Sequence, residues 1–207
     1  MKRKRKGSTP SGRAARGARK VGANRGDLSE KVEARLAPSD GYLHGETSHG
    51  GKAIAEYYYD DENGEAYHRI DRIEVEGRKR HKFSQYHWAK SKKGKQYWKK
   101  NAPKGPKIPY QLQRLTKADP EELIIITEGE KDADNAIDKL GLVATTNPNG
   151  AGKWLDYFKD HFKGKKRVAI IEDNDEPGRR HVQDVARNLN GTVPDIRIVS
   201  LPDLARC

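Results

Sequence analysis

The sequence contains a single cysteine, Cys207, and it is the last residue of the chain. One cysteine cannot form an internal disulfide framework or a zinc site built from cysteines. Because extracellular proteins often rely on disulfides, this scarcity favours a reducing cytoplasm. Long apolar runs are also missing, since none approaches the ~18 residues that a membrane-spanning helix needs. The basic N-terminus is not followed by the apolar segment of a secretory signal, so we expect no membrane partner.

Apolar side chains are scarce overall, at 33% of the 207 residues, whereas charged residues make up 35%. A chain so poor in core-forming residues is expected to leave part of its length unstructured. Residues 1–26 contain ten Lys and Arg, no acid and almost no large apolar side chain. We therefore predict a disordered basic tail over 1–26, which either attracts nucleic acid nonspecifically or serves for solubility or targeting.

Acidic residues are missing from a second segment as well. Residues 77–117 contain fourteen Lys and Arg and no Asp or Glu. The segment 27–76 carries thirteen acids against five basic residues, and 118–207 carries seventeen against thirteen. This alternation of basic and acidic blocks predicts a surface for a polyanion on one part of the molecule and separate chemistry on another.

The segment 27–117 is predicted to form a small, β-rich basic subdomain. A short helix is expected over Ser29–Pro38, followed by a β-hairpin with Asn63-Gly64 as its two-residue turn. Two loop histidines, His44 and His49, have no ligand partners nearby in the sequence. We interpret them as solvated side chains rather than as metal ligands.

Aromatic residues interleave with the basic residues of 77–117. Lys and Arg neutralise phosphates and aromatic faces stack on bases, so this pattern predicts contact with nucleic acid. The alternative is a solvated basic face whose aromatic residues form a small β core. The residues predicted to contact nucleic acid are Arg78, Lys79, Arg80, Lys82, Trp88, Lys92, Lys93, Lys95, Trp98, Lys99 and Lys100.

From residue 118 onward, short β-branched runs alternate with amphipathic segments. Strands are expected over 123–127, 142–146, 167–171 and 195–201, and helices over 131–141, 153–162 and 177–191. Such alternation is typical of a parallel α/β sheet with helices on its faces. We therefore predict that 118–207 forms one α/β domain.

Two acidic clusters directly follow predicted strands. Glu128 and Asp132 lie in TEGEKD after the first strand, and Asp173 and Asp175 lie in EDNDE after the third. Ligands of open α/β sheets bind at the carboxyl ends of the strands. Carboxylates crowded there repel one another, and a hard divalent cation such as Mg²⁺ relieves the repulsion. Gly129 is expected to let the backbone turn tightly beside this site.

The segment NPNGAGKW, residues 147–154, does not form a P-loop motif. Asn147 and Trp154 occupy positions at which that motif requires Gly and Ser or Thr. We predict a glycine-rich turn between a strand and a helix. Its backbone amides either face a phosphate group or belong to a simple tight turn.

The stretches ITEGEKDADNAIDKLGLVATTNPNGAGKW and VAIIEDNDEPGRRHVQDVARNL resemble the Toprim domain of bacterial-type DNA primases and of phage and plasmid primase–helicases. The resemblance covers residues 121–201. The preceding hairpin and basic block, which end in KIPYQLQRL, are similar to the N-terminal subdomain joined to Toprim in those proteins. The resemblance implies a Rossmann-like, four-stranded parallel sheet with flanking helices, after a β-rich basic subdomain.

The resemblance also implies roles for the acidic residues. Asp173 and Asp175 match the Asp-x-Asp pair that holds Mg²⁺ (or Mn²⁺) in the family. Glu128 matches a glutamate that acts as general base or as a further metal ligand, and Asp132 matches an acidic position that supports the metal site. Phosphoryl transfer depends on this kind of positioning and charge compensation.

On this basis we expect a Mg²⁺-dependent nucleotidyltransferase of the primase type. It would bind a single-stranded DNA template and join ribonucleoside triphosphates into short RNA primers, with a replicative helicase as a further partner. Lys153 and Arg179 lie where basic side chains could meet nucleotide phosphates. Two alternatives stay open: a noncatalytic single-stranded DNA-binding or helicase-associated module with a vestigial site, and a Toprim nuclease.

Overall fold

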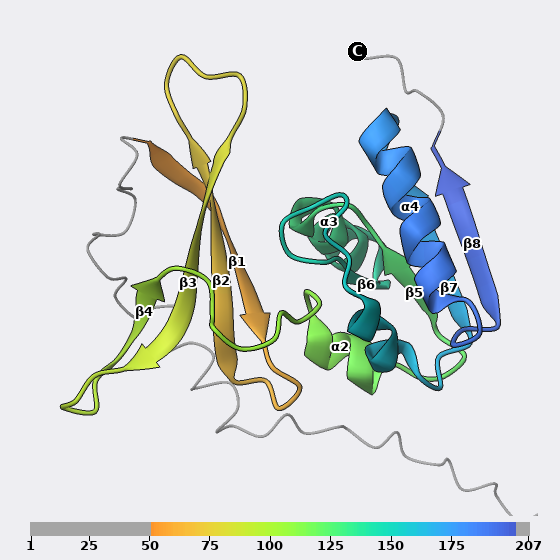
Figure 1. The fold of residues 1–207 in the computed structure, drawn as a ribbon, viewed down its shortest axis with the longest axis horizontal. Helices are drawn as coiled ribbons and strands as arrows, with labels where there is room; N and C mark the ends of the chain where they lie inside the picture. The colour runs from red at the N-terminus through yellow and green to blue at the C-terminus, as the bar shows by residue number, and fades with distance from the viewer. Residues whose placement is uncertain (1–50, 202–207) are drawn as a thin grey trace, which may run out of the picture.

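The computed structural model describes residues 51–201, which form two four-stranded sheets lying side by side (Figure 1). The first sheet is antiparallel, and the second is parallel with helices packed on it. The predicted fold class, a parallel α/β sheet preceded by a β-rich part, is therefore confirmed. The predicted tail 1–26, the predicted helix Ser29–Pro38, and His44 and His49 lie outside the described residues.

The antiparallel sheet is a meander whose strands follow one another in chain order. Its strands are β1 (Lys52–Asp60), β2 (Ala66–Glu74), β3 (Lys82–Lys90) and β4 (Gln96–Lys100). The predicted hairpin corresponds to β1 and β2, but its turn is longer than predicted. The backbone N–H of Asp61 donates to the carbonyl of Glu65 at 2.8 Å, and Gly64 has a φ of 89°. Three-residue loops that end in a left-handed glycine are a common alternative to the two-residue turn.

Side chains alternate between the two faces of this sheet, and both faces are packed. One face carries a cluster around Tyr86 and Trp98. The guanidinium of Arg69 lies above it, 4.4 Å from the centre of the Tyr86 ring, and binds Asp71 with 2.8 Å between Nε and Oδ1. Both charged side chains are almost fully buried. The opposite face, which carries Tyr57, packs toward the parallel sheet.

The parallel sheet has the strand order β6-β5-β7-β8, so β5 and β7 lie in its centre. Its strands are β5 (Leu123–Ile126), β6 (Val143–Thr145), β7 (Arg167–Glu172) and β8 (Asp195–Ser200), each ending within one residue of the prediction. The helices α3 (Glu130–Leu140) and α4 (Glu176–Leu189) also occur where the sequence predicted helices. Gly141, with a φ of 66°, terminates α3 as expected for a glycine after a helix.

Two short elements differ from the sequence-based expectations. The predicted helix 153–162 is a 3₁₀ helix, η1 (Asp156–Phe162), which begins late because Leu155 is extended, with φ −115° and ψ 141°. The helix α2 (Leu112–Lys117) has no counterpart among the predicted elements. Its residues Leu112 and Leu115 are buried in the core of the parallel sheet. Six residues are too few for an apolar period to be visible in the sequence.

Tyrosine side chains join the antiparallel sheet to α3. The Tyr59 hydroxyl donates to Glu130 Oε1 at 2.7 Å, and the Tyr110 hydroxyl donates to Asp134 Oδ1 at 2.9 Å. The two tyrosine rings pack against each other with centroids 5.0 Å apart. These contacts fix the spacing between the two sheets at the position of the acidic residues.

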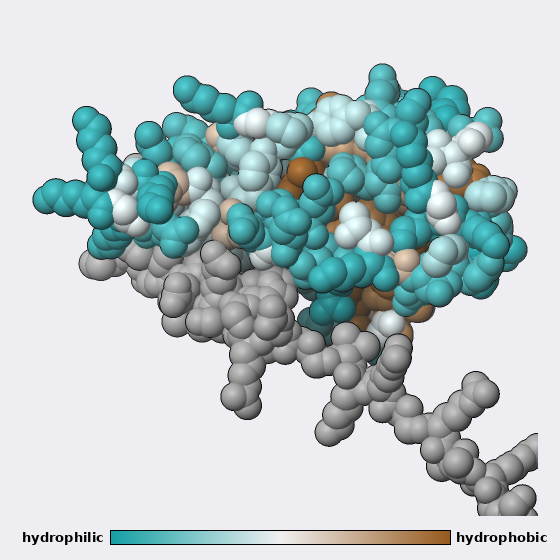
Figure 2. All heavy atoms as spheres, turned by 90° about the horizontal axis from the view of Figure 1, so that it is seen from below, coloured by the Kyte–Doolittle hydropathy of each residue, from teal (hydrophilic) through white to brown (hydrophobic). Residues whose placement is uncertain are grey.

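The surface of the two halves differs in polarity. Seen from below, hydrophilic side chains dominate the antiparallel sheet, whereas apolar surface shows between them over the parallel-sheet half (Figure 2). Within residues 51–201, no helix combines the length and apolar character needed to cross a membrane.

Candidate active site

Glu128 and Asp173 meet because the strands that precede them are neighbours. β5 and β7 pair in parallel with Ile126 opposite Ile170, so the residues that follow emerge at the same edge of the sheet. The carboxyl groups of Glu128 and Asp173 line the same cleft, and the charge of Asp173 contributes to the raised pKa of Glu128. The structure thus brings together two of the residues that the sequence placed at this edge.

Two threonine hydroxyls fix the turn that carries Glu128. Thr127 Oγ1 donates to the carbonyl of Gly129 at 2.9 Å, and Thr146 Oγ1 donates to the carbonyl of Glu128 at 3.0 Å. Both threonines are buried. The position of the Glu128 backbone is therefore set by the ends of β5 and β6.

The acidic pair is electrostatically strained. Burial, followed by the charges of Asp173 and Asp175, raises the pKa of Glu128 to about 7. Burial and the charge of Asp132 also raise the pKa of Asp173. Among residues 51–201, Glu128 Oε2 is buried without a hydrogen-bond partner. The fully ionised cluster is disfavoured unless a positive charge compensates it.

These features decide how well the residues fit Mg²⁺. Carboxylate oxygens are the donors that this ion prefers, and Glu128 Oε2 could provide one without losing another interaction. Asp132, in the first turn of α3, and Asp173 have exposed side chains. Within the described part of the chain, however, no three acidic, histidine or cysteine side chains form a ready-made metal site. The carboxylate oxygens fit Mg²⁺ chemically. Geometrically, the structure brings together the pair Glu128 and Asp173, with the carboxylates of Asp132 and Asp175 nearby.

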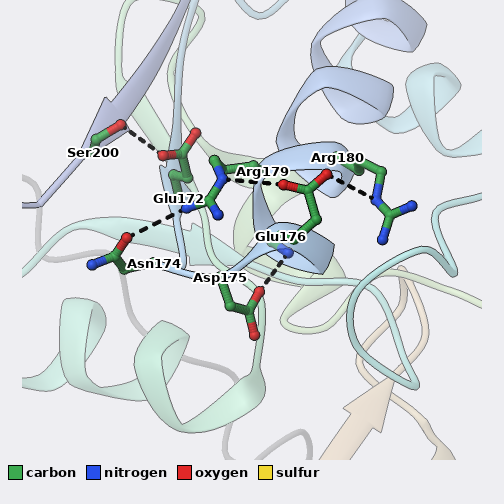
Figure 3. Close-up of polar contacts among 8 residues, drawn as sticks. Glu172, Asn174, Asp175, Glu176, Arg179, Arg180 and Ser200 are labelled. Carbon is green, nitrogen blue, oxygen red and sulfur yellow. Dashed lines mark hydrogen bonds and ion pairs between the residues drawn. The ribbon is translucent and has the colours of Figure 1, made fainter.

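Asp175 has a structural contact in addition to its predicted role. Its Oδ1 accepts a hydrogen bond of 2.7 Å from the Gly178 N–H and thereby caps α4 (Figure 3). A Cβ at Gly178 would lie 2.7 Å from the Asp173 carbonyl and 2.9 Å from Asp173 Cβ. Gly129, by contrast, has a φ of −134°, and a Cβ there would meet nothing within 4 Å. The expectation that the turn requires Gly129 is wrong, and Gly178 is the crowded glycine.

The other charged residues at the end of β7 and the start of α4 also have polar partners (Figure 3). Glu172 accepts a hydrogen bond of 3.0 Å from Ser200 Oγ. Glu176 lies 3.5 Å from Arg179 Nε and 3.6 Å from Arg180 Nε. Arg179 is exposed beside the acidic edge, and its contact with a phosphate stays a prediction.

The turn 147–154, which contains Lys153, is held by one hydrogen bond within the turn and one to α4. Asn147 Nδ2 donates to the carbonyl of Gly150 at 2.8 Å. The Gly152 N–H donates to His181 Nδ1 at 3.2 Å, so this amide already has an acceptor. Lys153 is exposed, and its contact with a phosphate also stays a prediction.

A cleft of about 420 Å³ opens between the two sheets at the acidic edge. It is lined by Glu128, Gly129, Glu130, Asp132 and Asp173, by Ile70 and Phe83 of the antiparallel sheet, and by Asn149 and Gly150. Gln85 Nε2 on β3 donates to Asn149 Oδ1 at 2.9 Å and so ties the two sides of the cleft together. Phe83 is one of the aromatic residues interleaved with the basic block, but the sequence did not place it beside the acidic residues, because only the register of β3 does so. Gln85 and Asn149 were not predicted as site residues.

The residues predicted to contact nucleic acid are spread along β3. Arg78, Lys79 and Arg80 lie in the β2–β3 connection, and Lys92, Lys93 and Lys95 lie in the β3–β4 turn. All six are exposed, and the two groups lie at opposite ends of a strand about 26 Å long. The β2–β3 connection projects from the same end of the molecule as the carboxyl end of β8 (Figure 1).

The strand residues of that prediction differ in accessibility. Lys99 is exposed, whereas Lys82, Lys100 and Trp88 are half-buried. Trp98 has 0% of its surface exposed and packs against Trp88 with ring centroids 4.9 Å apart. A base cannot stack on a ring without exposed surface, so the assignment of Trp98 to nucleic-acid contact is wrong. Trp98 belongs to the core instead.

Comparison with known proteins identifies the fold. The chain resembles the Escherichia coli primase catalytic core with a TM-score of 0.52 and 14% identity, over 89% of this chain and 55% of that one. It also resembles a DnaG primase catalytic domain bound to single-stranded DNA, with a TM-score of 0.51 and 13% identity, over 89% of this chain and 56% of that one. The chain therefore shares the fold of part of a primase catalytic core.

Sequence comparison adds one relative. No protein-family model matches the chain. The chain is 38% identical over 78 residues to the Gene 57 protein of Mycobacterium phage D29, a match that covers 38% of this chain and 47% of that protein. The chain therefore spans about half the length of this relative and of the primase structures.

Proposed function

We propose that this protein is a primase-type nucleotidyltransferase that binds a single-stranded DNA template and joins ribonucleoside triphosphates into short RNA primers. The observation that supports this most strongly is the Glu128–Asp173 pair at the edge of the parallel sheet. It lies in a cleft between the two sheets of a fold shared with primase catalytic cores.

Each acidic residue has a role in the proposed reaction. Asp173 and Asp175 would hold Mg²⁺ (or Mn²⁺), and Asp132 would support the ion from α3. When bound, the ion neutralises the charge that develops on the transferring phosphoryl group. Glu128, whose pKa is raised to about 7 by burial and its neighbours, can accept the proton of the attacking hydroxyl or serve as a further ligand.

The basic residues would guide the nucleic acid and the nucleotide. Arg179 is exposed in the first turns of α4, directly after the acidic loop, and Lys153 is exposed in the turn 147–154. Arg and Lys side chains at such positions compensate phosphate charge. The exposed basic residues at both ends of β3 would then attract the sugar-phosphate backbone of the template.

A second candidate function is a noncatalytic, single-stranded DNA-binding module. One observation favours it: no three candidate ligands form a ready-made metal site within residues 51–201. On this account the acidic pair is vestigial, and the basic residues of β3 and its flanking turns carry the function. The two candidates predict different products from the same incubation.

The deciding experiment incubates the protein with single-stranded DNA, labelled ribonucleotides and Mg²⁺ or Mn²⁺. New oligonucleotides that require both the template and the metal are the expected result. Salt-sensitive binding of the DNA without any incorporation would reject the primase proposal in favour of the binding module. Cleavage of the DNA in place of synthesis would instead assign the acidic site to a nuclease.

A further inference from the structure

Phe83 leaves 55% of its surface exposed, although it lies on β3, an inner strand of the antiparallel sheet. Single exposed apolar residues are common on protein surfaces and by themselves need no explanation. Phe83, however, lines the same cleft as Glu128, Asp132 and Asp173. It therefore adds an aromatic wall to an otherwise acidic site, and no step of the proposed chemistry uses it.

The register of the antiparallel sheet holds this ring in place. Phe83 lies opposite Arg72 and Gln85 lies opposite Ile70, so all four side chains share the face turned toward the parallel sheet. The hydrogen bond from Gln85 to Asn149 ties this part of β3 to the turn on the far side of the cleft. The Phe83 ring thus has a defined position relative to the acidic residues.

We propose that Phe83 is a stacking platform for a nucleobase in this cleft, and that it positions the nucleotide whose phosphates lie toward Glu128 and Asp173. This inference rests on the proposed function. A nucleotide has an anionic end that requires a cation and an aromatic end that prefers a flat apolar partner. The cleft offers carboxylates at one place and an exposed aromatic face at another. Stacking on an aromatic side chain accepts any base, as template-directed synthesis requires.

The test compares Phe83→Ala and Phe83→Trp with the wild-type protein. Two binding constants are measured separately in Mg²⁺, one for an oligo-dT strand and one for ATP. We expect Phe83→Ala to weaken at least one of them by about 5- to 150-fold, the range for loss of one base–aromatic stack. Phe83→Trp should retain binding, and stacking should quench the fluorescence that the new indole adds to the wild-type signal.

Ile54→Ala is the matched control, because Ile54 is 44% exposed on β1 of the same sheet and does not line the cleft. It should bind both probes like the wild type, and thermal unfolding should confirm that all variants are folded. If Phe83→Ala loses affinity for ATP alone, Phe83 stacks on the base of the incoming nucleotide. If it loses affinity for oligo-dT alone, Phe83 stacks on a base of the template.

Unchanged binding of both probes by Phe83→Ala would overturn the inference, as would an indole signal that neither probe alters. Both readouts are independent of turnover. The wild type could make no primers while Phe83→Ala still binds the probes more weakly than the wild type. That outcome would reject the proposed function but support the stacking role of Phe83.

Discussion

Gly178 and Gly129 both flank the acidic residues, but only one of them is sterically constrained. The first turn of α4 approaches the Asp173 backbone so closely that a Cβ at Gly178 would lie within 3 Å of it. At Gly129 the backbone is extended and the adjacent space is open. The sequence does not distinguish the two, because closeness between a helix and a preceding loop is a property of packing.

Gly178→Ala should therefore lower the free energy of unfolding by about 1–3 kcal/mol, the usual cost of overpacking. Alanine is the better helix former, so a loss of stability would come from the contact with Asp173 and not from helix propensity. Gly129→Ala is the control and should change stability by less than about 0.5 kcal/mol. Chemical denaturation measures both, and equal effects would contradict the assignment of the crowded position.

The sequence was sufficient to place some site residues but not others. Glu128 and Asp173 could be located because each follows a predicted strand and parallel strands end at one edge. Trp98 and Phe83 could not be assigned, because their environments depend on the face of β3 and β4 on which they lie. Trp98, which was predicted to contact nucleic acid, is buried, whereas Phe83, which was not among the predicted contact residues, is exposed in the cleft.

A hydrogen bond between Tyr59 and Glu130 connects β1 to α3, and we expect its loss to destabilise the fold. Tyr59→Phe removes the hydroxyl that donates to Glu130, whose pKa burial raises and this hydrogen bond lowers. The variant should be less stable by about 1–3 kcal/mol, because a largely buried carboxylate loses its partner. Tyr58→Phe is the matched control, since that hydroxyl contacts Glu56 of its own strand. A larger loss for Tyr58→Phe in thermal unfolding would contradict the role of Tyr59 as the anchor.

The two basic turns at the ends of β3 are expected to contribute unequally to single-stranded DNA binding. Alanine at Arg78, Lys79 and Arg80 should weaken single-stranded DNA binding more than alanine at Lys92, Lys93 and Lys95, because the first turn lies at the same end of the molecule as the carboxyl ends of the parallel strands (Figure 1). Each lost phosphate contact should reduce the slope of log affinity against log salt by about 0.7. Fluorescence anisotropy at several salt concentrations measures this, and the reverse ranking would contradict the proposed path of the template.

The sequence predicted most strands and helices of the parallel-sheet half, but it missed a short helix and mistook the type of another. The strands of the parallel sheet are short β-branched runs, and their limits agree with the structure to one residue. α2 was missed because it is short, and η1 was expected as a longer helix because Trp154 and Phe158 suggest one apolar face. The rings of Trp154 and Phe158 do pack together, with centroids 5.3 Å apart, but the backbone between them is extended at Leu155 and not helical there.

At the scale of the whole molecule, folding is linked to pH through a buried histidine. Desolvation lowers the pKa of His68 to about 4, whereas the unfolded chain protonates it near 6.5. As the pH falls from about 6.5 to 4, protons bind the unfolded state preferentially and stability is lost. The wild type should lose about 2 kcal/mol relative to His68→Gln over this range. Denaturation of both proteins at several pH values measures the difference, and a constant difference would contradict it.

The arrangement of the two sheets could not be predicted from the sequence. It depends on tyrosines that alternate along β1 and on Tyr110 beside α2, which pack against α3. The buried Arg69–Asp71 pair was likewise hidden, because in the sequence it is part of a charged block. The cleft exists only once these surfaces have met, which is why its aromatic wall emerged from the structure.

Template-dependent incorporation by Asp173→Asn, measured beside Glu176→Gln, decides whether the acidic edge carries nucleotidyl transfer. The two acids lie three residues apart, Asp173 after β7 and Glu176 at the start of α4, but Glu176 pairs with Arg179 and Arg180 and does not line the cleft. If the acidic edge holds the metal for nucleotidyl transfer, Asp173→Asn should lower the rate at least about 100-fold. Glu176→Gln should stay close to the wild-type rate. An Asp173→Asn protein that makes primers as fast as the wild type would contradict the account.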